Sequence, residues 1–145
     1  MQMRHASEFE IDDNVAELGA EWMRGACGRL RKLVSDGWCR VLVAEENCEL
    51  IAVLGLALHP SREGRPARAT ICELVVHPDH NHRGIGSRLV RFAEGIARIH
   101  GCLFVEVAPG LEGWGDGLCW RGLGYEDPQS GLHKNLGTTT LRSTM

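Results

Sequence analysis

The 145-residue sequence lacks several features that mark specialised classes of protein. It has no internal repeat, no low-complexity tract and no Cys-x-x-Cys pair, and its six cysteines are not spaced as zinc ligands are. Its longest apolar run, residues 50–58, is far shorter than the roughly 20 residues of a membrane-spanning helix. The acidic N-terminus has no apolar core of a signal peptide. We therefore expect a cytoplasmic protein with reduced thiols, no bound metal and no membrane contact.

The sequence also has no excess of basic residues. Lys and Arg together number 16 and Asp and Glu 19, which gives a net charge of −3. Nucleic-acid-binding domains of this size are usually clearly basic, so we expect no nucleic-acid partner. The hydrophobic fraction of 43% and the charged fraction of 24% are ordinary for a globular chain, and they predict a single domain over residues 1–145.

The first half of the chain reads as helices followed by a hairpin. Apolar residues recur with helical spacing over residues 11–22, and a second helical pattern covers residues 26–34. Two runs rich in branched apolar residues, 40–46 and 48–59, are separated by a short polar break and predict an antiparallel hairpin. The polar residues 61–68, with Gly and Pro, predict an exposed loop.

The second half contains a strand, a helix and a strand with short connections. These elements are expected at residues 69–77, 84–100 and 102–108. A βαβ unit of this kind makes its two strands parallel neighbours, so the hairpin and this unit together predict a mixed sheet. A glycine-rich loop is expected over residues 109–117 and a last strand over residues 132–136.

The most informative segment is VVHPDHNHRGIGSRLV, residues 75–90, where a strand, a turn and a helix follow one another. The first turn of a helix has backbone N–H groups without partners and a partial positive charge. Gly84 and Gly86 let an anion approach this backbone closely, and Arg83 and Arg88 add positive charge. The pattern predicts a phosphate or pyrophosphate site, although two such glycines can also serve a tight turn alone. It is not a P-loop, and Leu89 interrupts the Rossmann pattern.

Three histidines, His77, His80 and His82, lie in the same segment. They are either metal ligands or polar loop residues beside the anion site. The spacing follows a strand end, where side-chain directions are not set by sequence, so we favour polar loop residues and expect no metal.

Residues 76–86 resemble the acyl-CoA binding motif V-x-P-x-x-[RQ]-x-x-G-x-[GA] of the GNAT superfamily of N-acyltransferases. They depart from it at Asn81, where the family usually has Arg or Gln. Residues 4–6 are similar to the first strand of the family, residues 119–125 to its F-Y-x-x-x-G-[FY] element, and residues 133–136 to its closing strand. The resemblance therefore covers most of the chain.

The resemblance implies an α+β fold with α/β/α layers and a mixed, mostly antiparallel twisted sheet around a central parallel βαβ crossover. Residues 1–68 would form the N-terminal helices and hairpin, 69–108 the acyl-CoA binding unit, and 109–145 the C-terminal loop and strands. It implies acetyl transfer from acetyl-CoA to a primary amine of a small molecule or peptide, by direct attack in a ternary complex. Small members of the family often pair, which makes a homodimer a possible assembly.

The resemblance also assigns a donor site. The pyrophosphate would bind the backbone amides of residues 83–87, and the pantetheine arm would pair with the strand near residues 75–76. The thioester would lie between the strands at 69–77 and 102–108, which splay apart in the family. The implied cofactor-binding residues are Val75, Val76, Arg83, Gly84, Ile85, Gly86, Ser87 and Arg88.

Transfer to an amine needs a proton acceptor, because amines with a pKa near 10.4 are almost fully protonated at pH 7. Glu73 is the first candidate, since burial in an apolar strand favours the protonated carboxyl and some family members carry an acid there. The alternative is a structural Glu73, and Glu106 is the second candidate base. Trp120 stands where many members have an acidic Tyr, and a packing role is expected for it. Cys119 and Tyr125 are nearby substitutes for the acid.

Two departures from the family pattern, Asn81 and Trp120, also fit a second hypothesis. This is a non-catalytic acyl-CoA-binding sensor or regulatory module on the same fold. A third hypothesis, an interaction protein that binds no CoA, is disfavoured by the intact Arg83-Gly84-Ile85-Gly86 turn.

Overall fold

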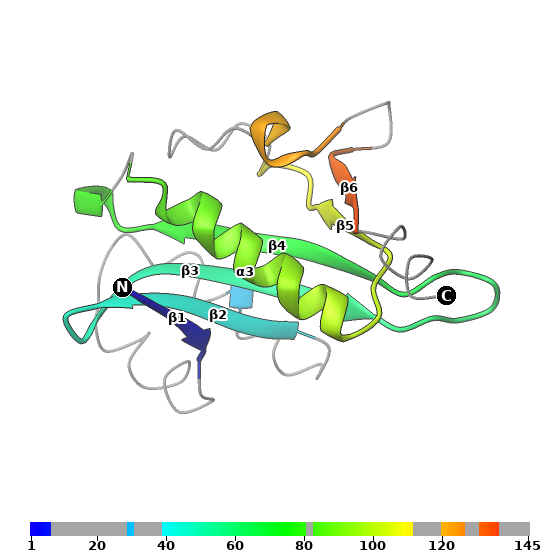
Figure 1. Cartoon of the computed structure of the whole chain (residues 1–145), viewed down its shortest axis with the longest axis horizontal. Coiled ribbons are helices and arrows are strands. Elements are labelled where there is room, and N and C mark those ends of the chain that lie inside the picture. The colour runs from blue at the N-terminus through cyan, green and yellow to red at the C-terminus, as the bar shows by residue number, and fades with distance from the viewer. Residues whose placement is uncertain (7–28, 31–38, 81–82, 112–119, 127–130, 137–145) are drawn as a thin grey trace, which may run out of the picture.

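The computed structural model describes residues 1–6, 29–30, 39–80, 83–111, 120–126 and 131–136. Within them, six strands form one sheet in the order β1-β2-β3-β4-β5-β6 (Figure 1). All neighbouring strands are antiparallel except β4 and β5, which are parallel. This confirms the predicted mixed, mostly antiparallel sheet. The strands are β1 (Gln2–His5), β2 (Cys39–Glu46), β3 (Glu49–His59), β4 (Arg68–Val76), β5 (Phe104–Val107) and β6 (His133–Asn135).

The hairpin of β2 and β3 turns through Asn47 and Cys48. Both residues have positive φ angles, 53° and 65°. A two-residue turn with two positive φ angles matches the twist of the paired strands. Residues 51–57 of β3 are all buried, because the sheet is covered on both faces at this strand. Burial on both faces explains why the sequence shows a continuous apolar run here instead of alternation.

The crossover between the parallel strands is made by η2 (Pro78–His80) and α3 (Ile85–Ile99). Pro78 follows the end of β4 after one intervening residue, and its fixed φ and missing N–H prevent the strand from continuing. Gly101, with a φ of 77°, ends the helix. The N–H of Gly101 donates to Arg98, and the N–H of Cys102 donates to Ala97. The predicted βαβ unit is confirmed, with its boundaries shifted by one or two residues.

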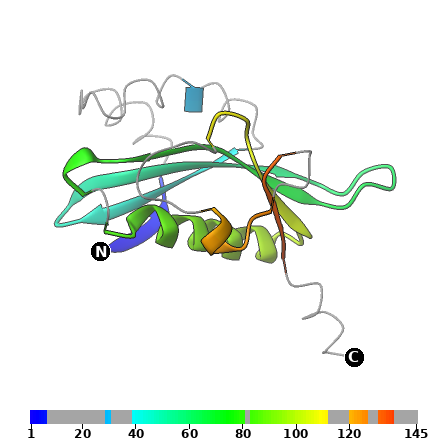
Figure 2. The ribbon, with the colours of Figure 1, turned by 90° about the horizontal axis from the view of Figure 1, so that it is seen from above.

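α3 packs on one face of the sheet, and the helical residues Arg29 and Leu30 lie on the other (Figure 2). Trp120 and Tyr125 join the core beneath α3, flanking the short helix η3 (Arg121–Leu123). No helix within these described ranges is long and apolar enough to cross a membrane. The predicted helix over residues 11–22, most of the predicted helix over 26–34, and residues 112–117 of the predicted loop lie outside the described residues.

Candidate functional site

β4 and β5 separate toward their C-terminal ends. Their pairing runs from Arg68 opposite Phe104 to Ile71 opposite Val107. The last hydrogen bond between β4 and β5 runs from the N–H of Ala108 to the carbonyl of Ile71 at 2.9 Å. β4 continues to Val76, paired among the described strands with β3 alone. Beyond Ile71, this edge of β4 is therefore open as far as the described residues go, and an extended ligand can pair with such an edge.

The direction of the backbone distinguishes the two valines at this open edge. The N–H of His77 donates to Ile51 of β3 at 2.8 Å. The N–H and C=O groups of successive residues in a strand point alternately to its two edges. Val75, two residues before His77, therefore turns its N–H and C=O toward β3, while Val76 and Leu74 present theirs to the open side. Sequence reasoning named Val75 and Val76 and missed Leu74, because the alternation can be assigned only once the register is known.

Glu73 lies at a β-bulge in the middle of β4. Gly55 of β3 is opposite Glu73 and Leu56 is opposite Ile71, so Cys72 is an extra residue in β4. Leu74 packs in the core beneath α3, which places Glu73 on the opposite face of the sheet. Glu73 is only 4% exposed. The bulge thus places a buried carboxylate where β4 and β5 begin to separate.

Arg29 binds this carboxylate with two hydrogen bonds. Its Nε donates to Oε2 of Glu73 at 2.6 Å, and its Nη2 donates to Oε1 at 2.9 Å. Gly55 of β3 lets residues 29–30 approach the sheet closely, because a Cβ at position 55 would lie 2.5 Å from Cδ2 of Leu30. Sequence reasoning missed Arg29, since nothing in the sequence links it to a residue 44 positions away.

The first turn of α3 has no side-chain cap. The N-cap residue is Gly84, with a φ of 76° that favours glycine. The first turn contains no acidic residue, and the N–H of Arg88 makes the bond to the Gly84 carbonyl at 3.1 Å. The N–H groups of Ile85, Gly86 and Ser87 precede that bond and have no acceptor within the helix. This end of α3 therefore offers donors and positive potential to an anion.

Arg83 is held beside this turn by Glu46 from the end of β2. Its Nη2 lies 3.1 Å from Oε2 of Glu46, and its Nη1 contacts Nδ1 of His80. The hydrogen bond from Arg83 lowers the pKa of Glu46 below its ordinary value. Arg83 is thus oriented by an exposed ion pair. Asn81 and His82 of the same motif lie outside the described residues.

A comparison of the sequence with models of known protein families shows which family the chain belongs to. Residues 7–113 match the acetyltransferase (GNAT) family. The chain belongs to the GNAT acetyltransferase family. No curated protein sequence matches it significantly.

Solved structures share the GNAT fold at low sequence identity. A transcriptional regulator from Bacillus halodurans is 22% identical with a TM-score of 0.68, over 90% of this chain and 96% of that one. An aminoglycoside antibiotic 6'-N-acetyltransferase from Acinetobacter haemolyticus is 19% identical with a TM-score of 0.64, over 87% and 91%. A ribosomal-protein-alanine N-acetyltransferase from Brucella melitensis is 16% identical with a TM-score of 0.63, over 77% and 83%.

The C-terminal GNAT element is packed into the core. Trp120 is 5% exposed, and its Nε1 donates to the carbonyl of Leu111 at 3.2 Å, which confirms the expected packing role. The hydroxyl of Tyr125 donates to Oε2 of Glu94 at 2.7 Å. Burial, followed by the charge of Glu94, raises the pKa of Tyr125 above its ordinary value. This environment argues against Tyr125 as an acid, and Cys119 lies outside the described residues.

The histidines, acids and cysteines of the described residues were candidates for metal binding and for nucleophilic chemistry. Within the described ranges, no three His, Cys, Asp or Glu side chains gather as metal ligands would. Cys39, Cys48, Cys72 and Cys102 are free thiols, and Cys48 is exposed. Burial raises the pKa of the Cys39 thiol to about 12, so it is protonated at neutral pH. Burial also raises the pKa of the Cys72 and Cys102 thiols, so none of these three thiols is activated as a nucleophile.

Proposed function

We propose that this GNAT protein transfers an acetyl group from acetyl-CoA to a primary amine, by direct attack while donor and acceptor are bound together. The observation that carries the proposal is the juxtaposition of two features at one end of the crossover. The open edge of β4 and the uncapped first turn of α3 are joined by η2 and the turn before α3. One accepts an extended amide chain and the other an anion, and CoA contains both groups.

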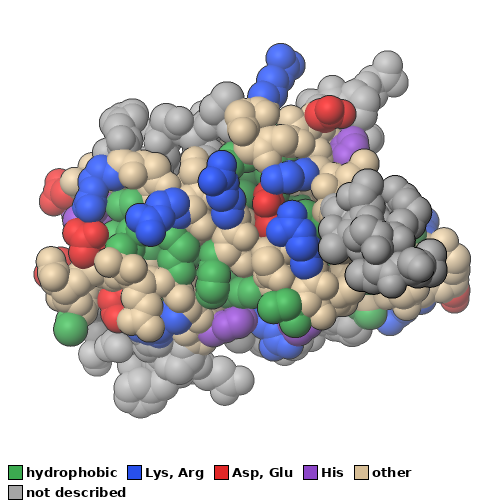
Figure 3. All heavy atoms as spheres, viewed as in Figure 1, with side chains coloured by type: hydrophobic (Ala, Val, Ile, Leu, Met, Phe, Trp, Pro, Cys, Tyr) green, Lys and Arg blue, Asp and Glu red, His purple; other side chains and the backbone are tan. Residues whose placement is uncertain are grey.

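The residues fit the donor in chemistry and in charge. The amides of Ile85, Gly86 and Ser87 would bind the pyrophosphate, and Val76 with Leu74 would pair with the pantetheine arm. α3 carries three exposed arginines, Arg88, Arg91 and Arg98, while its one carboxylate, Glu94, is buried. Figure 3 shows Lys and Arg side chains gathered on the face that α3 covers. This face is positive although the chain is negative as a whole, which favours an anionic donor. When bound, acetyl-CoA supplies an activated acetyl thioester.

Glu73 is the proposed proton acceptor for the attacking amine. Its carboxylate is buried at the point where β4 and β5 separate, which is where the thioester is expected. Arg29 occupies both carboxylate oxygens, so an amine or a bridging water must share one of them. Glu106 is the second candidate, and it lies beside Thr70, earlier along β4.

Two observations favour a second function, a non-catalytic acyl-CoA-binding module. Both oxygens of Glu73 are engaged by Arg29, and Trp120 stands where many GNAT enzymes have a Tyr. Such a module would keep donor binding and lack acetyl transfer.

The first test is binding of acetyl-CoA by calorimetry and thermal shift, with free CoA and ATP for comparison. Ligand at about 100 times its dissociation constant stabilises a fold by about 2.7 kcal/mol, which corresponds to roughly 5–10 °C in Tm at this size. Acetyl transfer is then followed by mass spectrometry, because six cysteines would react with thiol dyes. Binding with transfer supports the enzyme, binding without transfer supports the module, and absence of binding overturns both.

Ser87→Asp tests the donor site without threatening the fold. A carboxylate in the first turn stabilises a helix by about 0.3–1 kcal/mol but repels a pyrophosphate. We expect an unchanged or higher Tm and at least tenfold weaker CoA binding, about 1.4 kcal/mol. Gly95→Asp is the matched control, because it adds the same charge further along α3, where a new Cβ meets nothing within 4 Å. Wild-type affinity in Ser87→Asp would refute the assignment of this turn.

A further inference from the structure

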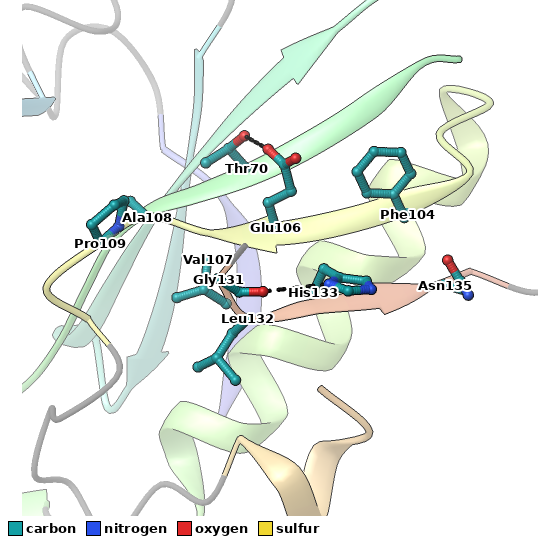
Figure 4. Close-up of a pocket in the computed structure, with 10 residues that line it drawn as sticks. All are labelled: Thr70, Phe104, Glu106, Val107, Ala108, Pro109, Gly131, Leu132, His133 and Asn135. Carbon is teal, nitrogen blue, oxygen red and sulfur yellow. Dashed lines mark hydrogen bonds between the residues drawn. The ribbon is translucent and has the colours of Figure 1, made fainter. Parts of the chain in front are cut away.

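A pocket of about 520 Å³ lies over β5 and β6 (Figure 4). Val105 and Val107 of β5 pack in the core beneath α3, so the alternate residue Glu106 faces the opposite side of the sheet. The pocket extends to Ala108 and Pro109, directly after the last bond between β5 and β4. It therefore borders the opening at which Glu73 lies. The lining residues that matter for a ligand are Thr70, Phe104, Glu106, Pro109, Leu132 and His133.

Three polar side chains of the pocket form a row across three strands. Thr70 is opposite Glu106 in the parallel pair, and Glu106 is opposite His133 in the antiparallel pair. Residues in register on neighbouring strands lie on the same face of a sheet. The row is therefore set by backbone pairing and does not depend on one flexible side chain.

The carboxylate of Glu106 is oriented through one of its two oxygens. Oε2 accepts a hydrogen bond from Oγ1 of Thr70 at 3.4 Å and lies 3.4 Å from Nε of Arg68. Oγ1 of Thr70 is in turn 3.0 Å from Nε2 of His59. Oε1 accepts no hydrogen bond from the described residues, and the side chain is 41% exposed. A solvent-accessible acceptor oxygen of Glu106 is thus available to the pocket.

The other lining groups favour a ligand that is cationic and has an apolar body. Phe104 provides an aromatic wall, and Ala108, Pro109 and Leu132 provide apolar surface. An ammonium group donates to a carboxylate oxygen and is attracted to an aromatic ring, whereas an anion would be repelled by Glu106. The pocket volume lies within the range of small-molecule sites.

We propose that this pocket binds a second, non-reacting ammonium group of the acceptor, with Glu106 as its anchor. The preferred acceptors are then molecules with two amino groups separated by an apolar linker. One amine reaches the opening beside Glu73 while the other is held by Glu106. The inference rests on the proposed acetyl transfer, and it names the class of acceptor for that same site.

Arg68 provides a second test of the inference, because its guanidinium would compete with the ligand's ammonium group for the carboxylate of Glu106. A bound ammonium adds to a site in which Glu106 is already partly neutralised at Oε2. Removing Arg68 should therefore strengthen binding of a diamine, whereas removing the charge of Glu106 should weaken it. A purely structural ion pair would not produce opposite effects on ligand affinity.

The test is calorimetric binding of 1,4-diaminobutane and 1,5-diaminopentane, each against its matched monoamine, to the full chain with free CoA present and absent. We expect the diamines to bind about five- to tenfold tighter than the monoamines, since a partly exposed charge pair contributes about 1 kcal/mol. Glu106→Gln keeps an oxygen that accepts from Thr70, and it should abolish the preference. Arg68→Gln should increase it. Glu49→Gln is the charge control, because Glu49 is exposed at the start of β3 and does not line the pocket.

The outcomes separate this inference from the proposed function. Diamines that bind no tighter than monoamines, or a preference that survives in Glu106→Gln, would overturn the inference even if acetyl transfer is observed. A preference that depends on Glu106 supports it even if acetyl-CoA does not bind, in which case the proposed function fails alone. The affinity for diamines decides whether the pocket binds a second ammonium group. Acetyl-CoA binding with acetyl transfer decides whether the proposed function is right.

Discussion

Arg29 and Glu73 form an ion pair with two hydrogen bonds, in which the arginine is exposed and the glutamate is buried. The side chain of Arg29 is 62% exposed and that of Glu73 is 5% exposed, although two hydrogen bonds join them. The hydrogen bond to Glu73 raises the pKa of Arg29 above its already high ordinary value. A guanidinium at the surface thus compensates a carboxylate charge buried in the sheet, and it attaches residues 29–30 to the bulge of β4.

Glu73→Gln should separate proton transfer from donor binding. If Glu73 accepts the proton, turnover at neutral pH should fall by about 10²–10⁴-fold while the Kd for CoA is unchanged. The residual rate should rise with pH, because the amine then loses its proton without help. The measurement is kcat between pH 6 and pH 9. Glu45→Gln is the control, since Glu45 pairs with Arg4 at the edge strand β1. An unchanged pH–rate profile would remove Glu73 as the base.

Arg29→Ala should destabilise the fold more than the same change at an arginine whose partner carboxylate is less deeply buried. It leaves a buried carboxylate without its guanidinium, which costs about 1–3 kcal/mol, with water offsetting part of the loss because Arg29 is exposed. Urea unfolding at pH 7 measures the effect. Arg4→Ala is the comparison, because its partner Glu45 is 26% exposed and such pairs contribute about 0–1 kcal/mol. Equal losses in the two variants would contradict the structural role of Arg29.

Tyr125→Phe should weaken the fold and leave catalysis intact. Glu94, at 2% exposure, accepts from the Tyr125 hydroxyl at 2.7 Å and from Nζ of Lys134 at 3.0 Å. Loss of a hydrogen bond to a buried charged group costs about 1.5–3 kcal/mol. We expect a lower free energy of unfolding with kcat within about twofold of wild type. A large drop in kcat with normal CoA binding would show that Tyr125 takes part in the chemistry.

The buried thiol of Cys39 should make the folded protein less stable at alkaline pH. Its pKa is raised from 9.0 to about 12 in the folded protein, so folding favours the protonated thiol. The resulting stabilisation is fully present below about pH 9, and it is lost as the pH rises toward 12. Urea unfolding at pH 7 and pH 10 should show a smaller decline in Cys39→Ala than in wild type. At neutral pH, iodoacetamide with mass spectrometry should label exposed Cys48 well before Cys39.

Local sequence patterns predicted the secondary structure well where neighbouring residues decide it. The predicted ends of β4 and α3 lie within one residue of the observed ends, because Pro78 and Gly101, just beyond them, restrict or permit backbone angles whatever the tertiary context. The burial of Trp120 also followed from the sequence. Predictions of individual site residues were weaker, since they depend on which strand edge is open and which side chain comes from a distant segment.

The sequence by itself determined the family, the βαβ crossover and the turn that begins α3, because motif spacing and periodicity are properties of contiguous residues. Tertiary structure decided the rest. Only strand register showed that Val76 and Leu74, and not Val75, face the open edge. Only packing brought Arg29 to Glu73, and only the pairing of three strands aligned Thr70, Glu106 and His133. These are contacts between residues far apart along the chain, and their geometry is set by the folded backbone.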